Sequence, residues 1–80
     1  MLKDIMDVYP DEDFLKADGF DGAIIGVDET EYRLIYSTKK CIEIMVENGN
    51  SYSEAIEYLE FNTFGSKIEN GPIWCHDDFN

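Results

Sequence analysis

The chain has 80 residues, a formal net charge of −12, 44% hydrophobic residues and 14% aromatic residues. This length predicts one domain over residues 1–80, and the hydrophobic content is too high for a disordered acidic tail. The acidic excess is spread along the chain, with ten acids against three bases in residues 1–37 and eight against three in residues 38–80. Such a charge argues against nucleic acid and anionic membranes as direct partners and favours basic protein surfaces or cations.

The two cysteines, Cys41 and Cys75, allow at most one disulfide. The first residues form a polar amphipathic segment instead of a signal peptide, and no apolar run approaches the roughly 20 residues that span a bilayer. We therefore expect a reduced cytoplasmic protein with two free thiols.

The N-terminal part predicts two short helices. Four apolar residues at helical spacing predict an amphipathic helix over residues 2–9, which Pro10 ends. Three acids over residues 11–13 precede Phe14, and they suit the positive end of a second short helix.

A β-hairpin is expected over about residues 23–36. The β-branched run over residues 23–27 follows a glycine-containing turn cluster and predicts a buried strand. After a polar turn, Tyr32, Leu34 and Tyr36 alternate with Arg33 and Ile35, which predicts the second strand. Because a two-stranded hairpin is not stable alone in water, helices must cover one of its faces.

A helical hairpin is expected over about residues 38–64. Ser37 or Thr38 caps its first helix, which ends at Asn48-Gly49 and turns Cys41, with the neighbouring Ile44 and Met45, toward the core. Only a residue or two separates this end from the next helix, so the two helices are joined by a tight turn.

The second helix of this pair is the most completely specified element of the chain. Ser51 and Glu54 have the spacing of a capping box, and Gly65 supplies a left-handed stop. Its apolar face follows i, i+3, i+4, i+7 spacing and consists of Tyr52, Ala55, Ile56 and Leu59. After it, Pro72 excludes a helix, and Ile73-Trp74 either extends along the hairpin or fills the core. The predicted fold is α+β: a β-hairpin covered by a helical hairpin, with a short N-terminal helix and an extended C-terminal segment.

Residues 19–74 resemble a family of small, uncharacterised acidic proteins of tailed bacteriophages. The resemblance covers about two thirds of the chain and rests on four blocks in one order: Gly-Phe-Asp-Gly-Ala-Ile-Ile-Gly-Val, Arg-Leu-Ile-Tyr-Ser, Glu-Ala-Ile-Glu-Tyr-Leu-Glu-Phe-Asn and Gly-Pro-Ile-Trp. It implies a viral protein in the cytoplasm of an infected bacterium, where small phage proteins commonly bind host factors or defence signals. It implies no established activity.

The candidate partner-binding residues lie on the helix after Ser51. Acidic side chains spaced along a rigid helix can imitate rows of phosphates, and aromatic side chains among them add contact area. These residues are Glu54, Glu57, Tyr58, Glu60 and Phe61. A plain solvated face is the competing interpretation.

A second candidate site centres on Arg33, the only arginine. Its guanidinium could bind a phosphate or carboxylate, with Tyr32 and Tyr36 beside it for stacking. The competing interpretation is a structural salt bridge. The run Cys75-His76-Asp77-Asp78 contains metal-ligand types, but adjacent ligands are poor zinc geometry, so we expect neither a metal site nor another cofactor.

With no catalytic motif, the sequence favours a non-enzymatic binding protein. We expect it to occupy a basic surface of a host protein and so inhibit a host factor or defence system, in the manner of a nucleic-acid mimic. The alternative is a small-molecule binder that sequesters a nucleotide immune signal. Homo-oligomerisation is left open.

Overall fold

The computed structural model describes residues 1–64 and 71–78. Its elements in chain order are α1 (Leu2–Val8), the short 3-10 turn η1 (Asp21–Ala23), β1 (Ile24–Asp28), β2 (Arg33–Ser37), α2 (Thr38–Glu47), α3 (Tyr52–Leu59), the π-helical turn η2 (Glu60–Phe64) and β3 (Ile73–Cys75). The predicted α+β class, the β-hairpin and the short N-terminal helix are confirmed.

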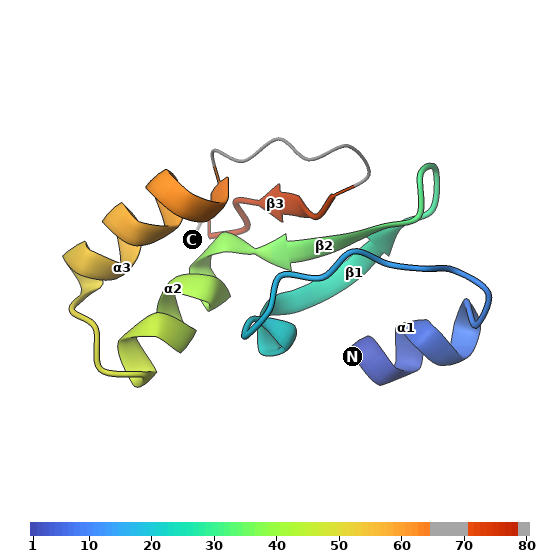
Figure 1. Ribbon diagram of the computed structural model, residues 1–80, viewed down its shortest axis with the longest axis horizontal. Helices are drawn as coiled ribbons and strands as arrows, with labels where there is room; N and C mark the ends of the chain where they lie inside the picture. Colours follow the sequence, from blue (N-terminus) through green and yellow to red (C-terminus); the bar gives the residue numbers. More distant parts are fainter. Residues whose placement is uncertain (65–70, 79–80) are drawn as a thin grey trace.

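The sheet has three strands in the order β1-β2-β3. β1 and β2 pair antiparallel, with Val27 opposite Leu34, and β3 pairs parallel with β2, with Trp74 beside Tyr36. The C-terminal segment therefore extends along the hairpin, which was one of the two expectations for it. Figure 1 shows β3 lying beside β2, far along the chain from the hairpin that it joins.

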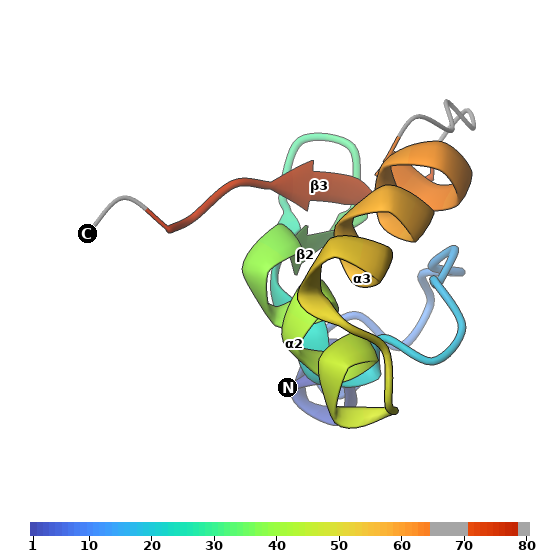
Figure 2. The ribbon, with the colours of Figure 1, turned by 90° about the vertical axis from the view of Figure 1, so that its left-hand side faces the viewer.

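One face of the hairpin carries most of the core. Leu34 and Tyr36 alternate with the half-exposed Arg33 and Ile35, and they are buried in a cluster that also contains Ile5, Phe14, Ala23, Ile24, Cys41 and Leu59. The two helices α2 and α3 lie side by side where β2 leaves the sheet, and α1 lies near the opposite end, against β1 (Figures 1 and 2). The core thus joins all three helices to the sheet.

The predicted second short helix does not form. Residues 12–17 have no regular secondary structure, yet Phe14 is buried and its ring contacts that of Tyr9 edge to face. Farther on, the backbone N–H of Ala17 donates to the hydroxyl of Tyr36 at 2.9 Å. These tertiary contacts hold the segment along the core in a non-helical path, so they override the favourable placement of three acids in a first turn.

The helical hairpin begins as the sequence predicted. Ser37 is the N-cap of α2, and its hydroxyl accepts from the N–H of Lys40. Cys41 is fully buried, while the half-buried Ile44 and Met45 pack against the core cluster. The predicted stop at Gly65 lies outside the described residues.

Candidate protein-binding face

The start of α3 is fixed by the predicted capping box. The N–H of Glu54 donates to the hydroxyl of Ser51 at 3.1 Å, and the N–H of Ser51 donates to the carboxylate of Glu54 at 3.0 Å. On the inner side of the helix, Ala55 and Leu59 are fully buried. The rotation of α3 about its axis is therefore set, and the side chains opposite Leu59 are directed to solvent.

This outer side of α3 contains a shallow hollow of about 480 Å³. Six residues line it: Asn50, Glu54, Glu57, Tyr58, Phe61 and Asn62. Four of the five predicted partner-binding residues are thus brought together around one depression. The fifth, Glu60, is exposed but does not line the hollow.

The two aromatic residues of the hollow are turned outward. Phe61 is 86% exposed and Tyr58 is 51% exposed. Phe61 belongs to the π-helical turn η2, and the side-chain amide nitrogen of the neighbouring Asn62 donates to the carbonyl of Tyr58 in α3 at 3.1 Å. Single π-helical turns occur frequently at functional sites.

One of the two carboxylates that line the hollow, that of Glu54, has a lowered pKa. The hydrogen bond from the backbone N–H of Ser51 lowers the pKa of Glu54, and the Ser51 hydroxyl adds to this effect. A hydrogen bond to the charged form of a carboxylate favours that form. Glu54 therefore stays ionised at pH values where an ordinary glutamate begins to take up a proton.

The alternative site residues are separated by the fold. The Nε of Arg33 donates to the carbonyl of Gly71 at 2.7 Å, and its Nη1 pairs with Glu31 at 3.2 Å. Tyr36 is fully buried against Trp74, with burial raising its pKa, whereas Tyr32 is exposed in the turn and contacts Tyr9. The two tyrosines therefore do not flank the Arg33 guanidinium on a common surface.

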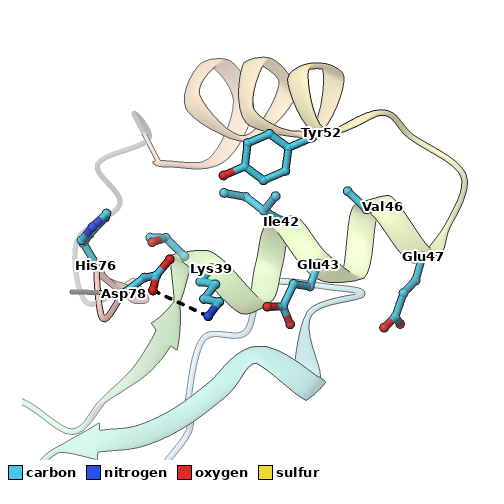
Figure 3. Close-up of a pocket in the computed structure, with 9 residues that line it drawn as sticks. Lys39, Ile42, Glu43, Val46, Glu47, Tyr52, His76 and Asp78 are labelled. Carbon is cyan, nitrogen blue, oxygen red and sulfur yellow. Dashed lines mark ion pairs between the residues drawn. The ribbon is translucent and has the colours of Figure 1, made fainter. Parts of the chain in front are cut away.

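Tyr52, which the sequence pattern placed on the buried face of α3, is 64% exposed, so this assignment was wrong. It is the first residue of the helix, and its ring lies over Ile42 of α2 (Figure 3). There it closes one side of a second hollow of about 620 Å³, lined by Thr38, Lys39, Ile42, Glu43, Val46, Glu47, Tyr52, His76 and Asp78.

Sequence reasoning missed this second hollow. Lys39, Ile42 and Val46 recur at i, i+3, i+7 on the outer side of α2, which is the one signal that could have indicated it. Its remaining walls come from α3 and from the C-terminal segment, where Asp78 pairs with Lys39 at 3.6 Å (Figure 3). Only the folded chain brings these three segments together.

The metal-ligand types near the C-terminus make structural contacts. Asp77 accepts a hydrogen bond from Ser37, and Asp78 forms the ion pair with Lys39. Within residues 1–64 and 71–78, no group of three or more cysteine, histidine or acidic side chains is arranged to hold a metal ion.

Comparisons of the chain with protein-family models, with curated proteins and with solved structures each found no match. None of the helices in the described part of the chain combines the length and the apolar character needed to span a bilayer.

Proposed function

We propose that the protein is a non-enzymatic binding protein that occupies a basic surface of a partner protein with the outer face of α3. One observation carries this proposal: Glu54, Glu57, Tyr58 and Phe61 line the same hollow on a helix whose opposite side is anchored in the core. The face combines negative charge, which attracts a basic partner, with exposed rings, which supply contact area once the partner has arrived.

The charge of the whole chain supports the same partner class. A net charge of −12 on 80 residues creates a negative field that accelerates association with a basic surface and slows association with an acidic one. Most of the exposed acids lie away from α3. They therefore contribute to this long-range attraction without contacting the partner protein. The specific part of recognition then rests on the hollow.

The resemblance to small acidic phage proteins suggests where such a partner would be found. In this proposal the partner is a host protein in the bacterial cytoplasm whose basic surface serves a host factor or a defence system. A basic surface that normally holds nucleic acid is a natural target, because carboxylates along α3 can take the places of phosphates.

The alternative function, sequestration of a nucleotide immune signal at Arg33, has weaker support. Arg33 already donates to Gly71 and pairs with Glu31, and Tyr36 is buried. A nucleotide would have to replace the contacts of Arg33 with Gly71 and Glu31 before the guanidinium could bind a phosphate. The surroundings of the binding face on α3 need no such rearrangement.

The test compares two variants that carry the same change in charge. The first is E54Q/E57Q/E60Q, which preserves the fold because these side chains are exposed and because glutamine also serves in a capping box. The control is E12Q/E29Q/E47Q, which removes three exposed glutamates that lie outside α3 and η2. A protein captured from bacterial lysate by the wild type is purified, and its association with each variant is measured against ionic strength.

The proposal predicts that the α3 variant loses most of its association rate at low salt and shows a flatter salt dependence. The control variant should lose only the smaller, long-range part. Equal losses in both variants would mean that the partner senses net charge alone, and no loss in either would mean that the charge serves solubility.

A further inference from the structure

We propose that the hollow on the outer face of α3 holds the side chain of an arginine from the partner. Its guanidinium would lie against the carboxylates of Glu54 and Glu57 and stack on the rings of Tyr58 and Phe61. This inference rests on the proposed function and narrows it from a basic surface to one side-chain chemistry.

The polar groups that line the hollow present hydrogen-bond acceptors. The amide nitrogen of Asn50 donates to the carbonyl of Met45 at 3.0 Å, and that of Asn62 donates to the carbonyl of Tyr58 at 3.1 Å. Because each amide group directs its nitrogen to the backbone, its oxygen is the atom best able to meet a ligand. Together with two carboxylates, these oxygens suit a ligand with several N–H donors.

The charge of the lining is of one sign. None of the six residues that line the hollow is basic, and Glu54 keeps its charge through the hydrogen bond from the N–H of Ser51. That bond engages the Oε1 of Glu54. An anionic ligand is therefore repelled, while a cation meets complementary charge.

The aromatic rings distinguish an organic cation from a metal ion. Phe61 is 86% exposed and contributes no packing to the core. A cation placed over the face of such a ring is attracted by the ring's quadrupole, whereas a metal ion needs oxygen, nitrogen or sulfur ligands in place of the rings. Rings beside carboxylates thus favour a side chain that carries both a cation and an apolar stem.

Among protein side chains, arginine fits this lining better than lysine. The guanidinium is planar and weakly hydrated, stacks on aromatic faces, and has five donors in a fixed fork. Those donors can reach acceptors that lie on different sides of one hollow. The ammonium of lysine is compact and strongly hydrated, so it gains less from the rings.

The experiment uses three blocked peptides that differ at one position: acetyl-Gly-Arg-Gly-amide, its lysine counterpart and its citrulline counterpart. Each is titrated into the whole protein, and amide chemical shifts of residues 54–62 report binding. We expect the arginine peptide to bind more tightly than the lysine peptide by at least about twofold. Citrulline has the shape of arginine without its charge, and we expect its peptide to leave the spectrum unchanged.

Three variants separate the contributions of rings and carboxylates. F61L keeps an apolar side chain but removes the ring, and we expect about two- to fivefold weaker binding of the arginine peptide. E57Q should weaken binding by a similar factor. E29Q removes an exposed carboxylate outside this hollow and should bind as the wild type does. Because all three positions are exposed, we expect the three variants to fold as the wild type does.

Three results would overturn the arginine assignment. The lysine peptide could bind as tightly as the arginine peptide, or the citrulline peptide could do so. The third is an F61L variant that binds the arginine peptide as tightly as the wild type does. The absence of peptide binding in a protein that still binds its purified partner through Glu54 and Glu57 would also overturn it. In those cases the proposed function stands, since it is tested separately by the salt dependence of the E54Q/E57Q/E60Q variant.

Discussion

The hydroxyl of Ser37 donates a hydrogen bond of 2.7 Å to the carboxylate of Asp77, 40 residues farther along the chain. The same hydroxyl accepts from the N–H of Lys40, so one side chain both caps α2 and holds the C-terminal segment. The first turn of α2 contains no acid and carries Lys39 and Lys40, which are unfavourable at the positive end of a helix. Asp77 and Asp78 supply the missing negative charge from a distant part of the chain.

This arrangement predicts that S37A destabilises the domain by about 1 to 2 kcal/mol, because it removes the cap and the link to Asp77 together. D77N keeps an acceptor for the hydroxyl and loses only the charge, so it should cost less than about 1 kcal/mol. Urea denaturation of the two variants gives both values. If D77N proves as damaging as S37A, the charge at the helix end matters more than the cap.

Leu59 joins α3 to the hairpin, since it is fully buried in the same cluster as Leu34 and Tyr36. We expect L59A to destabilise the domain by roughly 2 to 5 kcal/mol, a large share of the stability of a small protein. F61A, two residues along on the outer side, is the matched control and should leave the melting temperature nearly unchanged. An unchanged melting temperature for L59A would contradict the described packing of α3.

The capping box gives the domain an acid-sensitive contribution. Hydrogen bonds from the Ser51 N–H, then from its hydroxyl, lower the pKa of Glu54 in the folded state. Its contribution is therefore complete above the unfolded pKa of about 4.3 and is lost as pH falls through the lower folded value. The stability difference between the wild type and E54Q should be largest near pH 6 and shrink below pH 4.

The two cysteines differ in their surroundings. Cys41 is fully buried, and burial raises its pKa to about 11, whereas Cys75 is partly exposed on β3. Since the thiolate is the reactive form, we expect a thiol reagent at pH 8 to modify Cys75 in the folded protein while Cys41 is protected. After unfolding without reductant, two thiols should react. A count of zero would require a disulfide and a different position for β3.

Local sequence patterns determined several features of this protein. The capping box of Ser51 and Glu54, the cap at Ser37 and the alternation of Leu34 and Tyr36 all formed as predicted. Each depends on residues only a few positions apart, so the interaction energy is available before the rest of the chain is placed. The same local spacing placed Glu54, Glu57, Tyr58 and Phe61 near one another, because residues three or four apart share a helix face.

The tertiary structure decided the features that depend on distant partners. Residues 12–17 stay non-helical because Phe14 is buried in the core and Ala17 bonds to Tyr36. Tyr52 matches the apolar spacing of α3, yet it lies at the helix end over Ile42, where no neighbour buries its outer side. Periodicity gives the direction of a side chain around its own helix. Burial also requires a neighbouring element at the same height along the helix axis, and the packing of the rest of the chain sets the position of that element.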